Sequence, residues 1–340
     1  MALRAQFSHA GPGIQVRQRI DRRGAAASDY RLYGSPATKK LPQVDAELCE
    51  HCGNCTRCPY QAITLNRNKV PCFDAALCIG CSLCAAAGRQ AIIFVPESAP
   101  KAKLVQMVLY GARVIPVRGT YDDAFQLSLE YTAHKGGLNR NTAYHPLTLE
   151  GKKTVGLEIY EQNRFKVPDA ILVPVGDGVI ISGVHKAFLD LKAAGLTARL
   201  PRLICVQAER SAAIHHYIRT GKYQNARRPA TITDSISVSV PANAHLARRA
   251  VQESRGFSLI VTDREIVRGQ RTLAEKTGVF AEPAATATVA ALRRLQGTDL
   301  LGRREQIVLL ITGHGLKDVD AAARFLRFPA AVGPRPDAPL

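Results

Sequence analysis

Short apolar runs alternate with amphipathic stretches from about residue 91 almost to the end of the chain. The apolar runs have the length and branched composition of buried strands. They are AIIFV (91–95), ARVIPV (112–117), AILVPV (170–175), RLICVQ (202–207), SLIVT (258–262) and QIVLLIT (306–312). The stretches between them are typical of helices, and several end in glycine, a common helix stop. They are KAKLVQMVLYG (101–111), YDDAFQLSLEYTAH (121–134), GVHKAFLDLKAAG (183–195), NAHLARRAVQES (243–254), EIVRGQRTLAEKTG (265–278) and ATATVAALRRLQG (285–297). This alternation predicts an α/β fold with helices on a parallel sheet.

Composition divides the chain into four regions. We expect residues 1–43 to form a basic, poorly ordered arm because they are rich in Gly, Ser and Ala and show little periodicity. Residues 44–90 hold a cluster of cysteines, and residues 91–327 carry the βα pattern. Residues 328–340 are Pro-rich and are expected to form a loose tail.

The chain has 340 residues and a formal net charge of +18, which could attract phosphates, acidic partners or nucleic acid. The arginines are dispersed, aromatic residues make up only 6%, and there is no Trp, so the sequence argues against nucleic-acid recognition. No apolar run approaches the ~18 residues of a membrane span, and the basic start lacks the apolar core of a secretory signal. We therefore expect a cytoplasmic protein.

Eight of the nine cysteines lie between Cys49 and Cys84. Clustered cysteines in a chain without a signal peptide favour metal binding over disulfides. The ninth, Cys205, stands in the strand-like run PRLICVQAE and is expected to be a small buried apolar residue.

The cysteine cluster contains two runs with close, regular spacing. The first run is Cys49, Cys52, Cys55 and Cys58, followed by Pro, and the second is Cys78, Cys81 and Cys84. Such spacing lets thiolates hold the corners of an iron–sulfur cluster, although C-x-x-C pairs also build zinc sites. Three overlapping steps, a following Pro and a second triplet favour iron over zinc. The segment resembles bacterial-type ferredoxins, and the resemblance implies a 4Fe-4S cluster in a small α+β module.

This segment departs from the ferredoxin pattern in two ways. Two residues separate Cys55 from Cys58 where three are usual, and Gly88 stands where the second run would have its fourth cysteine. In two-cluster ferredoxins the fourth cysteine of a run ligates the other cluster. On that rule the complete ligand set is Cys58, Cys78, Cys81 and Cys84. The remaining thiols, Cys49, Cys52 and Cys55, could hold a three-iron cluster, a labile cluster, or one completed by Cys72 or a non-cysteine ligand.

The βα region is similar to a known enzyme family along most of its length. The matching stretches are IIFVPESAPKAKLVQM, YGARVIPVRGTYDDAF, LNRNTAYHPLTLEGKKTVGLEIYEQ, VPVGDGVIISGVHKAFLDL, ICVQAERSAAI, TGVFAEPAATATVAAL and LLITGHGLKD. From Ala91 to about Arg324 they resemble the carboxyl-terminal part of threonine synthase, a pyridoxal-phosphate enzyme of fold type II (tryptophan synthase β-like). The resemblance implies a lyase of threonine biosynthesis that converts O-phosphohomoserine and water into threonine and phosphate.

Two of these stretches are candidates for binding the cofactor. In VPVGDGVIISG, Gly176, Asp177, Gly178 and Val179 precede a helix expected to start near Gly183. Glycines let backbone amides approach a phosphate, and a helix amino terminus adds partial positive charge, although an ordinary βα turn would look similar. In LLITGHGLKD, the resemblance places the Thr312 hydroxyl at the pyridine nitrogen, where it would tune the cofactor as an electron sink.

The substrate site and the catalytic residues are less well defined. The stretch NRNTAYHPLTLEGKK resembles a loop that faces the substrate, with Asn141 and Thr142 as candidates for contacting the phosphate of O-phosphohomoserine. The histidines at positions 145, 215 and 216 are expected in surface or loop positions. No catalytic residue is assigned.

The amino-terminal half of the family, with its Schiff-base lysine and a following Ser/Thr-x-Gly-Asn stretch, has no counterpart in the sequence. Lys39 and Lys40 lie in a dissimilar segment, and Lys101 and Lys103 match family positions other than that lysine. A sheet without this half would expose edges and apolar surface. Either the ferredoxin-like segment and the arm cover them, or another chain does (a second copy or a complementing chain), or the isolated chain folds poorly.

Three interpretations follow from the sequence. The first is a threonine-synthase-like lyase fused to an iron–sulfur module. The second is a non-catalytic iron–sulfur protein, with a structural role or an electron-transfer partner, joined to a degenerate pyridoxal-phosphate domain. The third is a gene rearrangement that joined unrelated fragments.

Overall fold

The computed structural model describes residues 63–65, 71–73, 91–109, 111–227, 229–302 and 304–327. The predicted arm, the predicted tail and all seven predicted metal ligands lie outside these residues. The structure does not test these features, which stay predictions. Within the predicted ferredoxin-like segment the structure describes two short strands, β1 (Ile63–Leu65) and β2 (Pro71–Phe73). They form an antiparallel pair in which Thr64 lies opposite Cys72.

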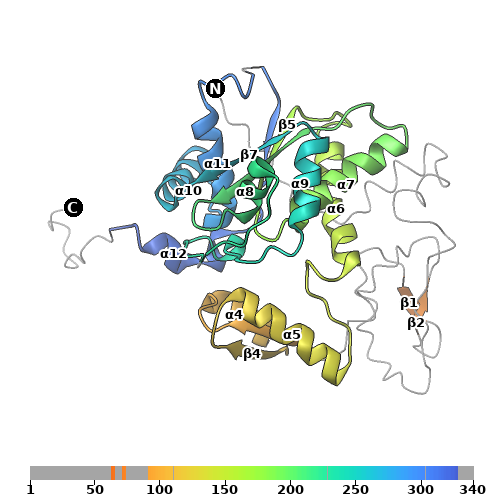
Figure 1. Ribbon diagram of the computed structural model, residues 1–340, viewed down its shortest axis with the longest axis vertical. Helices are drawn as coiled ribbons and strands as arrows, with labels where there is room; N and C mark the ends of the chain where they lie inside the picture. The colour runs from red at the N-terminus through yellow and green to blue at the C-terminus, as the bar shows by residue number, and fades with distance from the viewer. Residues whose placement is uncertain are drawn as a thin grey trace.

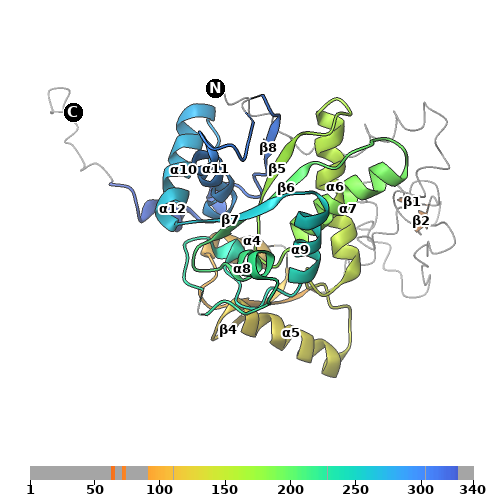
Figure 2. The same cartoon turned by 45° about the horizontal axis from the view of Figure 1, so that its top comes forward.

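The larger described unit is built on a four-stranded parallel sheet in the order β7-β6-β5-β8 (Figures 1 and 2). Its strands are β5 (Ala170–Pro174), β6 (Arg202–Ala208), β7 (Phe257–Val261) and β8 (Ile307–Leu309). β5 is buried along its whole length, and β6 is buried from Leu203 onward. Such continuous burial is typical of parallel strands that are covered on both faces.

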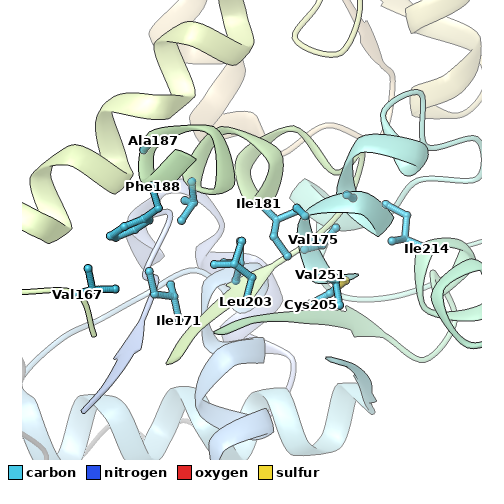
Figure 3. Packing of buried hydrophobic residues seen from close by; sticks show 14 of the residues in the cluster. Val167, Ile171, Val175, Ile181, Ala187, Phe188, Leu203, Cys205, Ile214 and Val251 are labelled. Carbon is cyan, nitrogen blue, oxygen red and sulfur yellow. The ribbon is translucent and has the colours of Figure 1, made fainter. Parts of the chain in front are cut away.

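Alternate residues of the central strands point to two separate cores. Ile171, Val173 and Cys205 belong to a core with Phe188 and other residues on one face of the sheet (Figure 3). Leu172, Ile204 and the other residues that point to the opposite face of the sheet belong to a second core. Cys205 is 0% exposed, which confirms its expected place as a small buried residue.

Helices cover both faces of this sheet. The first core receives α6 (Pro146–Gln162), α7 (Val179–Ala193), α8 (Ala213–Thr220) and α9 (Ala244–Glu253). The second receives α10 (Asp263–Thr277) and α11 (Pro283–Leu295). α10 begins with a capping box in which Thr262 and Glu265 satisfy each other's backbone amides. The carboxyl-terminal part adds the short helix α12 (Val319–Ala323).

Two glycines allow α6 and α7 to pack closely. A Cβ atom at Gly156 of α6 would lie 2.5 Å from the Cβ of Ala187, and one at Gly183 of α7 would lie 2.6 Å from the Cβ of Lys152. Both distances are shorter than the closest approach of two nonbonded carbon atoms. The crossing of these helices therefore requires glycine on each side.

A smaller unit follows the same βα pattern with two parallel strands, β3 (Ile92–Pro96) and β4 (Arg113–Val117). Its helices are α4 (Lys101–Leu109) and α5 (Tyr121–Lys135), drawn in orange and yellow in Figure 1. β3 is only half-buried apart from Val95. On α4, Val105, Val108 and Leu109 are 64%, 59% and 78% exposed.

The structure confirms a parallel α/β fold and strands at all six predicted places, with the last strand shorter than expected. Two predictions are corrected. The helix expected near Gly183 begins at Val179, because the first turn of α7 directly follows Gly178. The stretch 139–153 is not a continuous loop, since Pro146 opens α6. Among the described residues, no helix has both the length and the apolar character required to cross a membrane.

Candidate cofactor site

The segments predicted to bind the cofactor lie at the carboxyl-terminal end of the parallel sheet. β5 and β8 are parallel neighbours, paired from Ala170 opposite Ile307 to Leu172 opposite Leu309. The Leu310 amide extends this pairing by donating to the Leu172 carbonyl at 3.0 Å. The segments that follow, 176–179 and 311–314, therefore emerge at the carboxyl ends of adjacent strands, which is where ligands bind in parallel α/β sheets. The structure thus places the two predicted segments at the same end of the sheet.

The amino terminus of α7 can accept an anion. Gly178 precedes the helix in a left-handed conformation with φ of 91°. The Ser182 amide donates to the Gly178 carbonyl at 3.2 Å, so the amides of the preceding first-turn residues have no acceptor within the helix. These free donors and the helix dipole suit a phosphate group. A 15-residue helix carries the full terminal partial charge.

The two glycines of this loop also permit close packing within the protein. A Cβ atom at Gly176 would lie 3.0 Å from the Cα of Ile236, and one at Gly178 would lie 2.8 Å from the Cβ of Ala247. Ile236 belongs to a segment that crosses the loop, residues 231–240, which we call the strap. Close packing within the protein would therefore favour glycine at both positions, whether or not a phosphate binds.

Asp177 is held by two donors from different elements. Its Oδ2 accepts from the Tyr121 hydroxyl at 2.9 Å, and its Oδ1 accepts from the Ala242 amide at 3.4 Å. Burial raises the pKa of Asp177, and these two hydrogen bonds oppose that rise. Tyr121 is 36% exposed overall, yet burial around its hydroxyl and the adjacent Asp177 carboxylate raise its pKa. Both Asp177 side-chain oxygens are therefore engaged by donors of the protein.

On the other side of the site, Thr312 is half-buried, and the next residue packs against Glu282. The Glu282 amide donates to the Gly313 carbonyl at 2.9 Å. A Cβ atom at Gly313 would overlap the carboxylate of Glu282, so only glycine leaves room for that group. The segment after β8 and the start of α11 are therefore locked together.

Glu282 is a buried carboxylate in this site. It is 5% exposed, and its Oε2 lies 3.5 Å from the Ser235 hydroxyl of the strap. Burial raises the pKa of Glu282, and Asp234 adds to the rise, while Lys103 and Lys317 act in the opposite direction. A buried carboxyl with a shifted pKa and nearby charges is a common feature of functional sites.

Lys103 joins the small unit to this site. Its Nζ donates to Asp234 Oδ2 at 2.7 Å and to the Ser235 hydroxyl at 3.0 Å. The side chain is 22% exposed, and it projects from the first turn of α4. We call Lys103, Asp234, Ser235 and Glu282 the Lys103 cluster.

A cavity of about 520 Å³ lies after β6, one strand away from the candidate site. It contains none of the predicted cofactor residues. Its lining carries both signs of charge, and consists of Glu209, Arg210, Ala212, Ala213, His216, Gln224, Asn225, Ala226, Arg227 and Ala230.

The predicted substrate residues make their contacts elsewhere. The Asn141 side chain donates to the Ser128 hydroxyl of α5, and the Thr142 carbonyl accepts from the Thr148 hydroxyl. No described contact joins either residue to the loop after β5 or to Thr312. Their role in substrate binding remains a prediction. His145 precedes α6, and His215 and His216 lie on α8, where His216 is exposed and His215 is half-buried.

Sequence reasoning missed the Lys103 cluster as a group. Glu282 had one available signal, since the Pro that follows it is common at the first position of a helix. The pairing of Lys103 with Asp234 spans 131 positions, and no local pattern indicates it. Tyr121 was visible only as the start of a helix.

Comparison with known proteins defines the class of this chain. Residues 77–313 match the pyridoxal-phosphate dependent enzyme family, and the chain belongs to that family. The matched range begins before the second cysteine triplet, which the predicted boundary at residue 90 assigned to the ferredoxin-like segment. It includes residues 176–179 and Thr312 of the candidate cofactor site.

The curated relatives include threonine synthases. That of Methanocaldococcus jannaschii is 38% identical over 239 residues, covering 68% of this chain and 58% of the relative. That of Methanosarcina acetivorans is 37% identical over 238 residues, covering 69% of this chain and 58% of the relative. The chain thus spans less than two thirds of the length of these proteins.

Solved structures support the fold. A threonine deaminase of T.th. gives a TM-score of 0.57 at 22% identity, covering 69% of this chain and 73% of that one. Maize serine racemase gives a TM-score of 0.58 at 21% identity, covering 72% of each chain. The described α/β fold is therefore that of these enzymes.

Proposed function

We propose that the chain is a threonine-synthase-like lyase that uses pyridoxal phosphate to convert O-phosphohomoserine and water into threonine and phosphate. The observation that carries this proposal is the identity of 37% and 38% to two threonine synthases over about two thirds of the chain. The matched family range includes residues 176–179 and Thr312 of the candidate cofactor site.

The residues of the site suit the cofactor. Pyridoxal phosphate supplies an electron sink that stabilises negative charge at substrate carbons. The amides at the start of α7, together with Gly176, Asp177, Gly178 and Val179, would hold its phosphate. Thr312 would offer its hydroxyl to the ring nitrogen. Glu282 and Ser235 lie between these two segments and would shape the space for the ring.

The substrate carries its own phosphate, which requires a second anion site. Asn141 and Thr142 are our candidates, because an amide and a hydroxyl both donate hydrogen bonds to phosphate oxygens. Asn141 would have to exchange its contact with Ser128 for one with the substrate. This exchange predicts a movement of the segment between α5 and α6 when the substrate binds.

We further propose that the amino-terminal part holds a ferredoxin-type 4Fe-4S cluster. The support is the cysteine spacing alone. The complete ligand set would be Cys58, Cys78, Cys81 and Cys84, and a second cluster at Cys49, Cys52 and Cys55 is a hypothesis. After anaerobic reconstitution, Cys58→Ala should abolish the iron signal of the complete site, while Cys49→Ala should spare it. Equal loss in both variants would refute this division of ligands.

The second candidate function is a non-catalytic iron–sulfur protein with a degenerate cofactor domain. It is favoured by the lack of a segment in this sequence that resembles the family's lysine motif. In that case pyridoxal phosphate could still bind through phosphate and ring contacts, without turnover.

A single assay separates the two functions. The purified chain is loaded with pyridoxal phosphate and incubated with O-phosphohomoserine, and both inorganic phosphate and threonine are measured. We expect equal amounts of the two products and none without the cofactor. Homoserine, which lacks the phosphate, serves as the matched substrate control. Binding of the cofactor without any phosphate release would reject the lyase and leave the non-catalytic function.

A further inference from the structure

The cavity that follows β6 has the size of a small-molecule site. Its volume of about 520 Å³ lies within the range of ligand pockets, roughly 300–1,000 Å³. Glu209, Arg210 and Ala213 line it where β6 leads into α8, and Asn225 and Arg227 line it from the segment before the strap. None of these residues belongs to the candidate cofactor site, so the cavity is a separate feature of the molecule.

Two arginines determine the chemistry of this cavity. Arg210 and Arg227 both contribute to its lining, and both are exposed. Other arginines of the same unit pair with carboxylates, as Arg202 and Arg294 do. By contrast, no acceptor among the described residues pairs with the guanidinium group of Arg210 or Arg227. A carboxylate or a phosphate in the cavity would pair with both, because its oxygens match the planar fork of a guanidinium group.

The lining also offers partners for a cationic group. Glu209 is the only acidic residue among the described lining residues, and no described donor pairs with its carboxylate. Gln224 and Asn225 add amide groups, which both donate and accept hydrogen bonds. Two arginines against one glutamate favour a molecule that carries both signs of charge with negative charge in excess. An amino acid with an acidic side group has this distribution of charge.

Hydrogen bonds to the strap hold both walls of the cavity. The Ser211 hydroxyl, in the turn that carries the first arginine, donates to the Ile236 carbonyl at 2.9 Å and accepts from the Val238 amide at 3.0 Å. The Ala226 amide, in the segment that carries the second arginine, donates to the Ser239 carbonyl at 2.9 Å. The backbone on both sides is therefore fixed before a ligand binds, which reduces the entropic cost of binding.

We propose that this cavity binds an amino acid whose side group is a carboxylate or a phosphate. Arg210 and Arg227 pair with the acidic side group, and Glu209 accepts hydrogen bonds from the α-ammonium group. The side-chain amides of Gln224 and Asn225 donate to the α-carboxylate. The binding includes no covalent step and does not involve pyridoxal phosphate, so this inference stands or fails independently of the proposed function.

The test is calorimetric titration of the full-length chain with two matched pairs of amino acids. Phosphoserine and serine differ only in the phosphate, and aspartate and asparagine differ only in the charge and amide of the side group. We expect one acid or both to bind at least about tenfold more tightly than the neutral partner, because charged groups form the stronger hydrogen bonds. The pair with the larger difference identifies the anion as phosphate or carboxylate. Equal affinity within both pairs, or no binding of either acid, would overturn the proposal.

Substitutions then test whether the acid binds in this cavity. Arg210→Gln and Arg227→Gln should each weaken binding of the preferred acid at least about tenfold. Arg219→Gln is the matched control, since Arg219 is exposed on α8 but is not part of the lining, and it should bind the acid as the wild type does. Equal weakening in all three variants would show that the acid follows the net charge of +18, and this result would overturn the proposal.

A second measurement uses the wild-type chain and does not depend on the folding of any variant. Phenylglyoxal modifies accessible arginines, and peptide mapping locates the modified residues. The preferred acid should protect Arg210 and Arg227 from modification and leave Arg219 reactive. Protection of Arg219 to the same extent, or no protection of the two lining arginines, would contradict the proposal.

Discussion

The two described units share one sequence pattern but reach different degrees of burial. In the larger unit, β5 is buried at every position between neighbours on both sides. In the smaller unit, β3 pairs with β4 alone among the described strands, and only Val95 is buried. Parallel strands normally need several neighbours and helices on both faces. The difference shows that an apolar run makes a core only where enough other strands surround it.

The units meet through polar contacts at the candidate cofactor site. Tyr121 donates to Asp177, and Lys103 contacts Asp234. The Asp122 carboxylate accepts from the amides of Ser239 and Val240 of the strap, both at 3.0 Å. Hydrophobic burial thus stabilises the larger unit, while hydrogen bonds set how the small unit lies against the strap. A cofactor at this junction would contact residues of both units.

The largest expected effect on the free energy of unfolding comes from a comparison of two phenylalanine replacements, one in each unit. Phe188 is 0% exposed in the larger unit, so Phe188→Ala should lower the free energy of unfolding by about 3–5 kcal/mol. Phe94 of β3 is half-buried, so Phe94→Ala should cost clearly less. Urea unfolding followed by circular dichroism measures both. Equal losses would mean that the small unit is as well packed as the large one.

A smaller effect should follow from breaking the contact between the units. Asp122→Ala leaves two strap amides without their acceptor, which should cost about 1–3 kcal/mol. Asp122→Asn keeps one acceptor oxygen and should cost less. Hydrogen exchange of the Ser239 and Val240 amides reports the contact directly. Unchanged protection in Asp122→Ala would show that other groups hold the strap.

The pH dependence of stability should reveal the buried Glu282. Burial raises its pKa in the folded protein above the unfolded value, so the folded state binds more protons. Its contribution to the free energy of unfolding therefore falls as pH rises from the ordinary glutamate pKa through the raised one. Glu282→Gln cannot ionise and should reduce this decline. Urea unfolding of both proteins from about pH 4 to 8 covers the window. An identical decline in both would argue against a raised pKa.

The smallest effect is expected on the exposed face of α4. Leu109 is 78% exposed, so Leu109→Ser should change the free energy of unfolding by no more than about 0.5 kcal/mol. Leu191, which is 3% exposed on α7, provides the contrast, and its replacement by Ser should be strongly destabilising. Thermal unfolding at several protein concentrations compares them. A large, concentration-dependent loss in Leu109→Ser would reveal a second chain on this face.

Local patterns predicted the strands well because the formation of a strand by a short apolar run depends mainly on the run itself. α6 escaped this reasoning. Its sequence contains Gly151 and Gly156, which weaken the helical pattern. Its stability comes from close packing against α7, where Gly156 faces Ala187. Packing between distant segments leaves no periodic trace in the sequence.

The candidate site was predictable only in part, for the same reason. The glycine loop and Thr312 lie at strand ends, which the pattern locates. Lys103 and Glu282 reach the site through contacts with the strap, whose course depends on tertiary structure.

The central claim is that the amino terminus of α7 binds the phosphate of pyridoxal phosphate. Its most direct test is a binding titration of the chain with pyridoxal phosphate and with pyridoxal, which lacks only the phosphate. We predict that pyridoxal phosphate binds at least about tenfold more tightly, which corresponds to about 1.4 kcal/mol. Equal affinity for the two molecules would contradict the claim.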